Sequence, residues 1–132
     1  MNEQERSDYI VHRLRNATET LQEARILASS KLLRGAVNRI YYSMFYAVSA
    51  LALHHGFSTA SHSQLRGYFN REFIKTGRIS TELGKAYGAA FDSRSKGDYD
   101  DLVVFETEQV GQMLKEAEAF LDAIVSVIGE SA

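Results

Sequence analysis

Arg94 and Tyr99 are separated by four residues in the charged stretch RSKGDYDD, residues 94–101, which also holds three aspartates. A guanidinium can clamp a phosphate through two parallel hydrogen bonds, and a phenol can donate a hydrogen bond or a proton. Asp98 lies between the two and could orient either side chain. Alternatively, Arg94 pairs with Asp98 or Asp101 in a structural ion pair, which contributes little where it is exposed. The residue types leave both interpretations open.

A second group of polar and aromatic side chains lies in NRIYYSMFYAVSA, residues 38–50. Tyr42 and Tyr46 are four residues apart, and Arg39 precedes them by three and seven, so these side chains share one face of a helix. They could line a cleft that stacks a base and holds a phosphate. They could equally be core tyrosines whose hydroxyl groups find partners within the fold. Tyr41, with Phe45 and Val48, is expected on an adjacent, more apolar face of the same helix.

His62 follows Ser61, which is placed to cap a helix, so its imidazole would lie near the positive end of the helix dipole. A phosphate is also favoured there, although a plain surface position explains the residue as well. His54 and His55 are neighbours on a helix and point about 100° apart, so they cannot both face one metal ion. Without cysteine, a calcium loop or a glycine-rich phosphate loop, we expect no metal and no cofactor.

The composition of the chain favours helices. Its 132 residues suit a single domain, 1–132, and 45% hydrophobic with 24% charged residues is ordinary for a globular protein. The chain has no proline, so no helix interior is interrupted by a missing backbone N–H donor, and long helices are expected. The N-terminal segment lacks the apolar core of a signal peptide, and no apolar run approaches the roughly 20 residues that span a bilayer, so a cytoplasmic protein with no membrane partner is expected.

Charge is distributed unevenly along the chain. Residues 98–132 hold nine acidic residues and one basic residue, a net charge of −8, whereas residues 1–97 hold fourteen basic and eight acidic residues, a net charge of +6. Such a division can attract phosphates or a partner to one face of a protein. An acidic C-terminal helix can also be a solvated face with no partner.

Apolar residues recur at steps of three and four in five segments, which predicts helices over about 7–30, 31–56, 61–77, 80–94 and 107–128. Ser7, Ser61 and either Ser80 or Thr81 are the expected N-caps. Amphipathic helices of this kind assemble most simply as an all-α, antiparallel, up-and-down four-helix bundle with an additional short helix.

Three stretches carry a resemblance to a known family: NRIYYSMFYA, then SH before a short aromatic helix ending FIKTG, then RSKGDY before the last helix. In order and spacing they resemble the HEPN family, in particular the stand-alone proteins often encoded beside a minimal nucleotidyltransferase. The resemblance implies a helical bundle that forms a homodimer with a cleft near the two-fold axis. Many family members are metal-independent ribonucleases, including toxins, whose motif leaves four to six residues between an arginine and a histidine.

Arg94 matches the arginine of that motif, but Tyr99 stands where the histidine is expected. A phenol, with an ordinary pKa near 10, is a weak general base, so any endoribonuclease activity would be weakened. The resemblance therefore implies a nucleotide- or RNA-associated module of a toxin–antitoxin-like pair, with Arg94, Tyr99 and Asp98 as catalytic candidates and Arg39, Tyr42, Tyr46 and His62 as binding candidates. An active ribonuclease using Arg94 and Tyr99, and a non-catalytic helical dimer, are the alternatives. Tyr99 is also a candidate to accept a nucleotidyl group from the partner transferase.

Overall fold

The structure is a computed structural model that describes residues 1–130 of the chain. Within these residues every regular element is a helix, as the apolar spacing predicts. The elements, in chain order, are α1 (Glu3–Ser29), α2 (Leu33–His54), α3 (His62–Phe69), the one-turn π-helix η1 (Asn70–Ile74), α4 (Thr81–Tyr99) and α5 (Thr107–Glu130).

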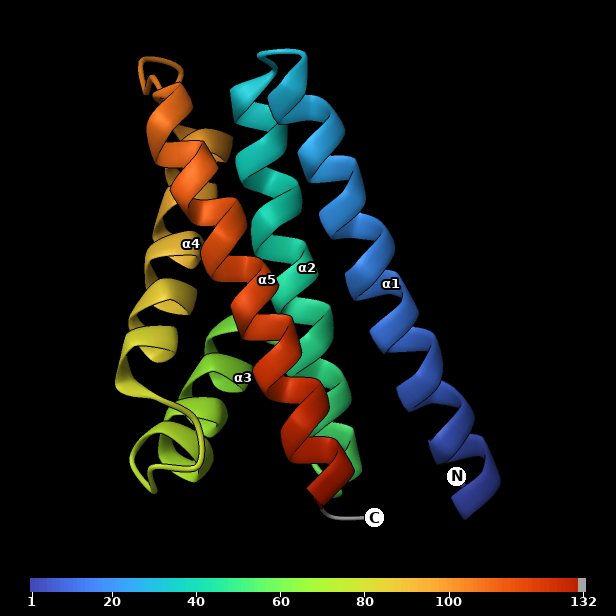
Figure 1. The fold of residues 1–132 in the computed structure, drawn as a ribbon. Helices are drawn as coiled ribbons and strands as arrows, with labels where there is room; N and C mark the ends of the chain where they lie inside the picture. Colours follow the sequence, from blue (N-terminus) through green and yellow to red (C-terminus); the bar gives the residue numbers. More distant parts are fainter. Residues whose placement is uncertain (131–132) are drawn as a thin grey trace.

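The four long helices run alternately in opposite directions, and α3 with η1 closes one end of the bundle between α2 and α4 (Figure 1). This is the predicted up-and-down four-helix bundle with an additional short helix. Helix α2 contributes the most buried residues, among them Tyr41, Met44 and Leu51. Because α2 packs against α1, α3, α4 and α5, its side chains can reach a site formed by several helices.

Capping residues fix where the site helices begin. Ser61 caps α3 by accepting a hydrogen bond from the Gln64 backbone N–H at 3.2 Å, and Ser80 caps α4 in the same way through the Leu83 N–H at 3.3 Å. Both caps are confirmed. The cap predicted at Ser7 is wrong, because α1 already starts at Glu3, where the Asn2 side chain accepts from the Glu5 N–H at 2.8 Å.

Helix α4 is longer than its sequence predicts, since it continues past Arg94 to Tyr99. The Asp100 N–H still donates to the Lys96 carbonyl at 2.8 Å, so the charged stretch forms the last helical turns and not a break. Gly97 is tolerated there because the Phe105 ring packs against it, with one ring carbon 3.4 Å from where a Cβ would stand. On an α-helix, side chains five residues apart point about 140° away from each other.

Arg34 of α2 holds the turn that follows α4. Its guanidinium donates to the backbone carbonyls of Gly97 and Asp100, and to that of Val103 at 3.0 Å. These bonds satisfy carbonyls at the helix end that have no partner within the helix. They also fix the position of the last turns of α4 relative to α2.

Candidate functional site

Arg94 is largely buried although it carries a charge. Its side chain is 12% exposed, and Nη1 donates to the Asp98 carboxylate one turn later at 3.2 Å. The guanidinium carbon lies 4.7 Å from the centre of the Tyr41 ring and 5.5 Å from that of Tyr42. The carboxylate and the faces of the two rings therefore compensate a charge that burial would otherwise penalise.

Arg94 retains hydrogen-bonding capacity. Nη2 makes only a long contact of 3.5 Å to His62 Nδ1, and Nε is buried without a hydrogen-bond partner among the residues described. Burial by itself lowers the pKa of Arg94, but the hydrogen bond that Arg94 donates to Asp98 and the neighbouring phenols outweigh it, so the pKa is raised above its usual value. The group is a permanent cation with more N–H donors than these contacts use.

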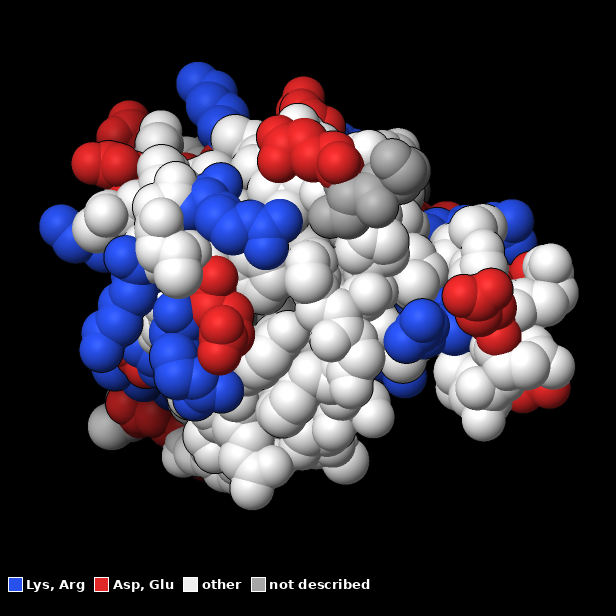
Figure 2. All heavy atoms as spheres, turned by 90° about the horizontal axis from the view of Figure 1, so that it is seen from below, with Lys and Arg blue, Asp and Glu red and all other residues white. Residues whose placement is uncertain are grey.

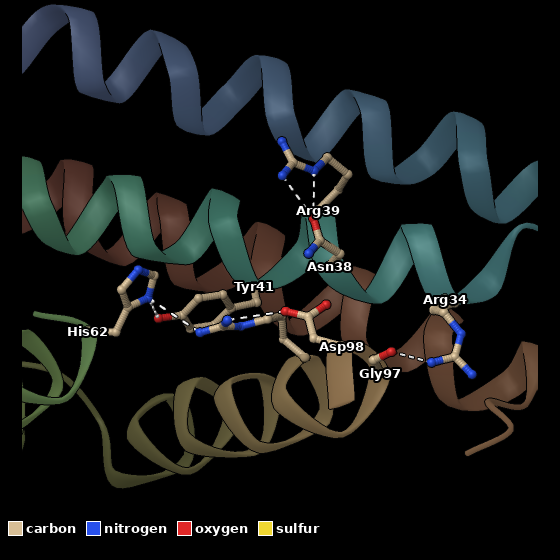
Figure 3. Close-up of polar contacts among 8 residues, drawn as sticks. Arg34, Asn38, Arg39, Tyr41, His62, Gly97 and Asp98 are labelled. Atoms are coloured by element: carbon tan, nitrogen blue, oxygen red, sulfur yellow. Dashed lines mark hydrogen bonds and ion pairs between the residues drawn. The ribbon is translucent and has the colours of Figure 1, made fainter. Parts of the chain in front are cut away.

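His62 is the first residue of α3, and two aromatic residues of α2 hold its ring in place. Its Nδ1 lies 2.6 Å from the Tyr41 hydroxyl oxygen, and its ring stacks on Phe45 with 4.2 Å between the ring centres and an angle of 11°. Figure 3 shows Tyr41 lying between His62 and Asp98. The imidazole is thus fixed in position and orientation beside Arg94.

Burial and the neighbouring charge set the protonation states of this pair. Burial, and then the positive charge of Arg94, lower the pKa of His62 below its usual value. Burial raises the pKa of Tyr41, and the lowering effect of Arg94 does not cancel it. At neutral pH a neutral imidazole and a neutral phenol therefore lie beside a permanent cation.

We call Arg94, Asp98, Tyr41, Tyr42 and His62 the Arg94 site. It brings together residues from α2, α3 and α4 that the sequence separates by up to 57 positions, from Tyr41 to Asp98. Of the predicted residues, Arg94 contacts both Asp98 and His62 within it. The site thus places a guanidinium next to an imidazole that Tyr41 and Phe45 hold in position.

The predicted residues Arg39, Tyr42 and Tyr46 lie on the neighbouring face of α2. The Arg39 guanidinium carbon is 5.1 Å from the Tyr42 ring centre, and the Tyr42 and Tyr46 rings are 6.1 Å apart. Tyr42 therefore links Arg39 to Arg94. Arg39 itself turns toward α1 (Figure 3), where it approaches Glu23 at 3.8 Å, so it marks the border of the site.

Tyr99 lies apart from these contacts. It is the last residue of α4, its side chain is 84% exposed, and the five-residue step along the helix turns it about 140° from Arg94. The expected approach of the guanidinium and the phenol toward one side depended on the helix ending near Arg94. Since α4 continues to Tyr99, the Arg94 guanidinium and the Tyr99 phenol of one chain do not point toward the same side of the helix.

The sequence pattern does not indicate Tyr41 as part of the site, or Arg66 as a residue next to it. Tyr41 was expected on the apolar face, where its ring is indeed buried, but its hydroxyl contacts His62. Arg66 lies one turn after His62 on α3, and its guanidinium carbon is 5.0 Å from the centre of the Phe91 ring, which Arg94 approaches at 5.9 Å. The four-residue step from His62 to Arg66 was the available signal.

Basic residues outnumber acidic ones in the segment that contains α3 and η1, which closes one end of the bundle (Figure 1). The segment 62–85 contains Arg66, Arg71, Lys75, Arg78 and Lys85 but only two acidic residues, Glu72 and Glu82. Figure 2, which views the molecule from this end, shows Lys and Arg side chains gathered on the side of α3 and η1. Such a surface attracts a polyanion before any specific contact forms.

Two features are absent from residues 1–130. No three histidine, aspartate or glutamate side chains in that range form a group suited to a metal ion. No helix in that range has the length and apolar character needed to cross a membrane.

Comparison with known proteins identifies the fold family. A family model described as "HEPN domain" matches residues 10–128. The chain belongs to the HEPN domain family. It is 48% identical over 128 residues to a "UPF0332 protein" of Thermotoga maritima, covering 97% of this chain and 96% of the relative.

Two archaeal relatives carry names that refer to a toxin. This HEPN domain is 34% identical over 109 residues to "Putative toxin MJ0142" of Methanocaldococcus jannaschii, covering 83% of this chain and 74% of the relative. It is 32% identical over 114 residues to "Putative toxin MJ0605" of the same organism, covering 86% and 84%. The match to the family extends across α2, α3 and α4, which carry the Arg94 site.

Proposed function

We propose that this HEPN domain is a toxin-like protein that binds RNA or a nucleotide by a phosphate group at the Arg94 site. The observation that carries the proposal is the buried Arg94 guanidinium, which is 12% exposed and held by one carboxylate, one imidazole and aromatic faces. In these surroundings the guanidinium keeps N–H donors that the protein does not use and that can bind a phosphate. The names of the two archaeal relatives support the toxin-like part.

The surroundings of Arg94 suit a nucleotide in two ways. The spare N–H donors can bind phosphoryl oxygens, and Tyr42 with Tyr46 offers aromatic surface on which a base can stack. The basic segment 62–85 can follow a longer phosphate backbone. These features favour a chain of several nucleotides over a mononucleotide.

The test is binding of a short fluorescein-labelled, single-stranded RNA, followed by anisotropy at low salt. Arg94→Ala and Arg94→Lys should each weaken binding by about 10-fold or more, because lysine keeps the charge but not the planar fork. Arg15→Ala, at an exposed position of α1, is the matched control. Equal affinities for the wild type and both Arg94 variants would refute the proposal. Competition with a mononucleotide separates the two ligand classes.

We also propose that the protein is one half of a toxin–antitoxin-like pair with a minimal nucleotidyltransferase. Tyr99 supports this part, since its phenol is 84% exposed and accessible to another protein. Attack of the phenol oxygen on the α-phosphorus of a nucleoside triphosphate would attach a nucleotidyl group and release pyrophosphate. Mass spectrometry after incubation with such a transferase should show the added group, and Tyr99→Phe should abolish it. An unmodified wild-type chain would refute this part alone.

A further inference from the structure

Arg94 and His62 form an arginine–histidine pair that the sequence does not show, because 32 residues separate them. Building on the proposed binding of RNA at the Arg94 site, we propose that His62, and not Tyr99, is the residue that accepts a proton from the RNA in metal-independent cleavage. The histidine comes from α3 and the arginine from α4. The inference therefore concerns a catalytic residue in a different place from Tyr99.

The two nitrogens of His62 have different surroundings. Nδ1 is occupied, since it lies 2.6 Å from the Tyr41 hydroxyl and 3.5 Å from Arg94 Nη2. Nε2 has no hydrogen-bond partner among the residues described, and Figure 3 shows it on the side of the ring opposite Tyr41. With the ring also stacked on Phe45, the imidazole presents a fixed, unused nitrogen next to the phosphate-binding cation.

Tyr41 allows that nitrogen to act as a base. A guanidinium can only donate hydrogen bonds, whereas a phenol can donate or accept. Without RNA, the contact from Arg94 favours Nδ1 as an acceptor, which leaves the ring proton on Nε2. When a phosphate takes up the N–H groups of Arg94, Tyr41 can accept from Nδ1–H, and Nε2 then carries a lone pair. Tyr41 is thus a positioning residue that acts through His62.

The reaction balances without any group beyond RNA and the protein. The 2'-hydroxyl gives its proton to His62 Nε2 as its oxygen forms a bond to the adjacent phosphorus. The bond from phosphorus to the 5'-oxygen breaks, and the leaving oxygen takes a proton from the imidazolium, which returns His62 to its neutral form. Arg94 stabilises the charge on the phosphoryl oxygens. The products are a 2',3'-cyclic phosphate and a 5'-hydroxyl end.

The charged and titratable groups that face His62 come from two helices. Arg94, paired with Asp98, approaches it from α4, and the phenols of Tyr41 and Tyr42 approach it from α2. Because burial and Arg94 lower the pKa of His62, the neutral base predominates at neutral pH. Cleavage should therefore decrease as the pH falls through the lowered pKa of His62.

The experiment measures cleavage and binding of the same labelled RNA, with a chelator present, by the full chain. We expect a cyclic phosphate product from the wild type and none from RNA with 2'-deoxy sugars. His62→Asn should slow cleavage by about 100-fold or more, the usual contribution of a general base, while RNA binding changes much less. Tyr41→Phe should give a smaller loss of rate and a changed pH profile. His12→Asn, on the exposed face of α1, is the matched control.

The outcomes separate this inference from the proposed function. RNA that binds to the wild type in an Arg94-dependent way but is not cut would overturn the role of His62 and leave the binding function standing. RNA that does not bind would refute both. Full cleavage by His62→Asn with loss in Tyr99→Phe would overturn the inference in favour of Tyr99. Circular dichroism confirms that each variant is folded, and His62→Gln replaces His62→Asn if the latter is not.

Discussion

The hydrogen bond between Tyr41 and His62 connects two helices, because Tyr41 lies on α2 and His62 is the first residue of α3. The imidazole was expected at a helix N-terminus and the phenol in the core, and both positions are confirmed. Their contact depends on how α2, α3 and α4 pack, since 21 residues separate them along the chain. Local spacing predicts the place of each residue on its own helix, but a contact between helices depends on tertiary packing.

At the residue scale, we predict that Arg94→Gln raises the pKa of His62. Burial of the ring remains, but the positive charge that disfavours the imidazolium is removed. Nuclear magnetic resonance of the histidine Cε1–H signals as a function of pH measures this pKa directly. His12 serves as an internal reference on α1. An unchanged titration of His62 would mean that Arg94 does not act on it.

Folding stability should also depend on pH through two histidines. Burial lowers the pKa of both His62 and His54, and nearby positive groups lower each further. As the pH falls through about 6.5, the unfolded chain takes up protons at these residues before the folded protein does, so the free energy of unfolding decreases. Urea titrations from pH 8 to about pH 5 measure the decrease. The decrease should be smaller in His62→Asn than in His12→Asn, and identical curves would contradict the prediction.

At the element scale, the length of α4 determines the directions in which the Arg94 and Tyr99 side chains point. The sequence predicts that this helix ends near Arg94, because a glycine and several charged residues follow, and these usually mark a helix end. The Asp98 ion pair, the Phe105 ring against Gly97 and the Arg34 bonds to the turn continue it to Tyr99. The caps at Ser61 and Ser80 were predictable because capping is a local interaction, whereas this extension depends on residues from α2 and the α4–α5 turn.

Arg34→Ala should loosen the end of α4. The loss of its hydrogen bonds to three backbone carbonyls should cost about 1 kcal/mol in the free energy of unfolding, since water can replace part of these bonds at an exposed site. Hydrogen exchange of amides 97–103 should become faster, while that of α1 stays the same. Arg15→Ala is the control. Unchanged exchange in this segment would show that Arg34 does not hold the turn.

The packing of α4 on η1 can be tested with two glycines. A Cβ at Gly84 would stand 3.0 Å from two carbons of the branched Ile74 side chain, so Gly84→Ala should destabilise by about 1–3 kcal/mol despite its better helix propensity. Gly111 on α5 has open space at that position, so Gly111→Ala should stabilise by about 1 kcal/mol. Chemical denaturation measures both. Equal effects of the two substitutions would contradict the packing described here.

At the scale of the whole molecule, the fold follows from the sequence more directly than the site does. Four amphipathic helices and a short one specify the bundle because each apolar stripe must be buried. The uneven charge along the chain also has a spatial counterpart, since the basic segment 62–85 lies at the end of the bundle next to His62. If this surface guides RNA, binding should weaken steeply with salt, and anisotropy between 50 and about 200 mM salt measures the slope.

The homodimer remains a prediction. Light scattering of the purified chain at micromolar concentration should give twice the mass of 14.8 kDa that the sequence specifies. A dimer would allow Tyr99 of one protomer to approach the Arg94 site of its partner, even though α4 turns the two side chains apart within one chain. A monomer at that concentration would exclude such a shared site and leave the Arg94 site to act within a single chain.

The most direct test of the central claim observes the His62 ring while RNA is added. We expect that the Cε1–H signal of His62 shifts on titration with a short single-stranded RNA, that the signal of His12 does not, and that Arg94→Gln removes the shift. Saturation of RNA binding with the His62 signal unmoved in the wild type would show that RNA binds away from the Arg94 site and would refute the proposal.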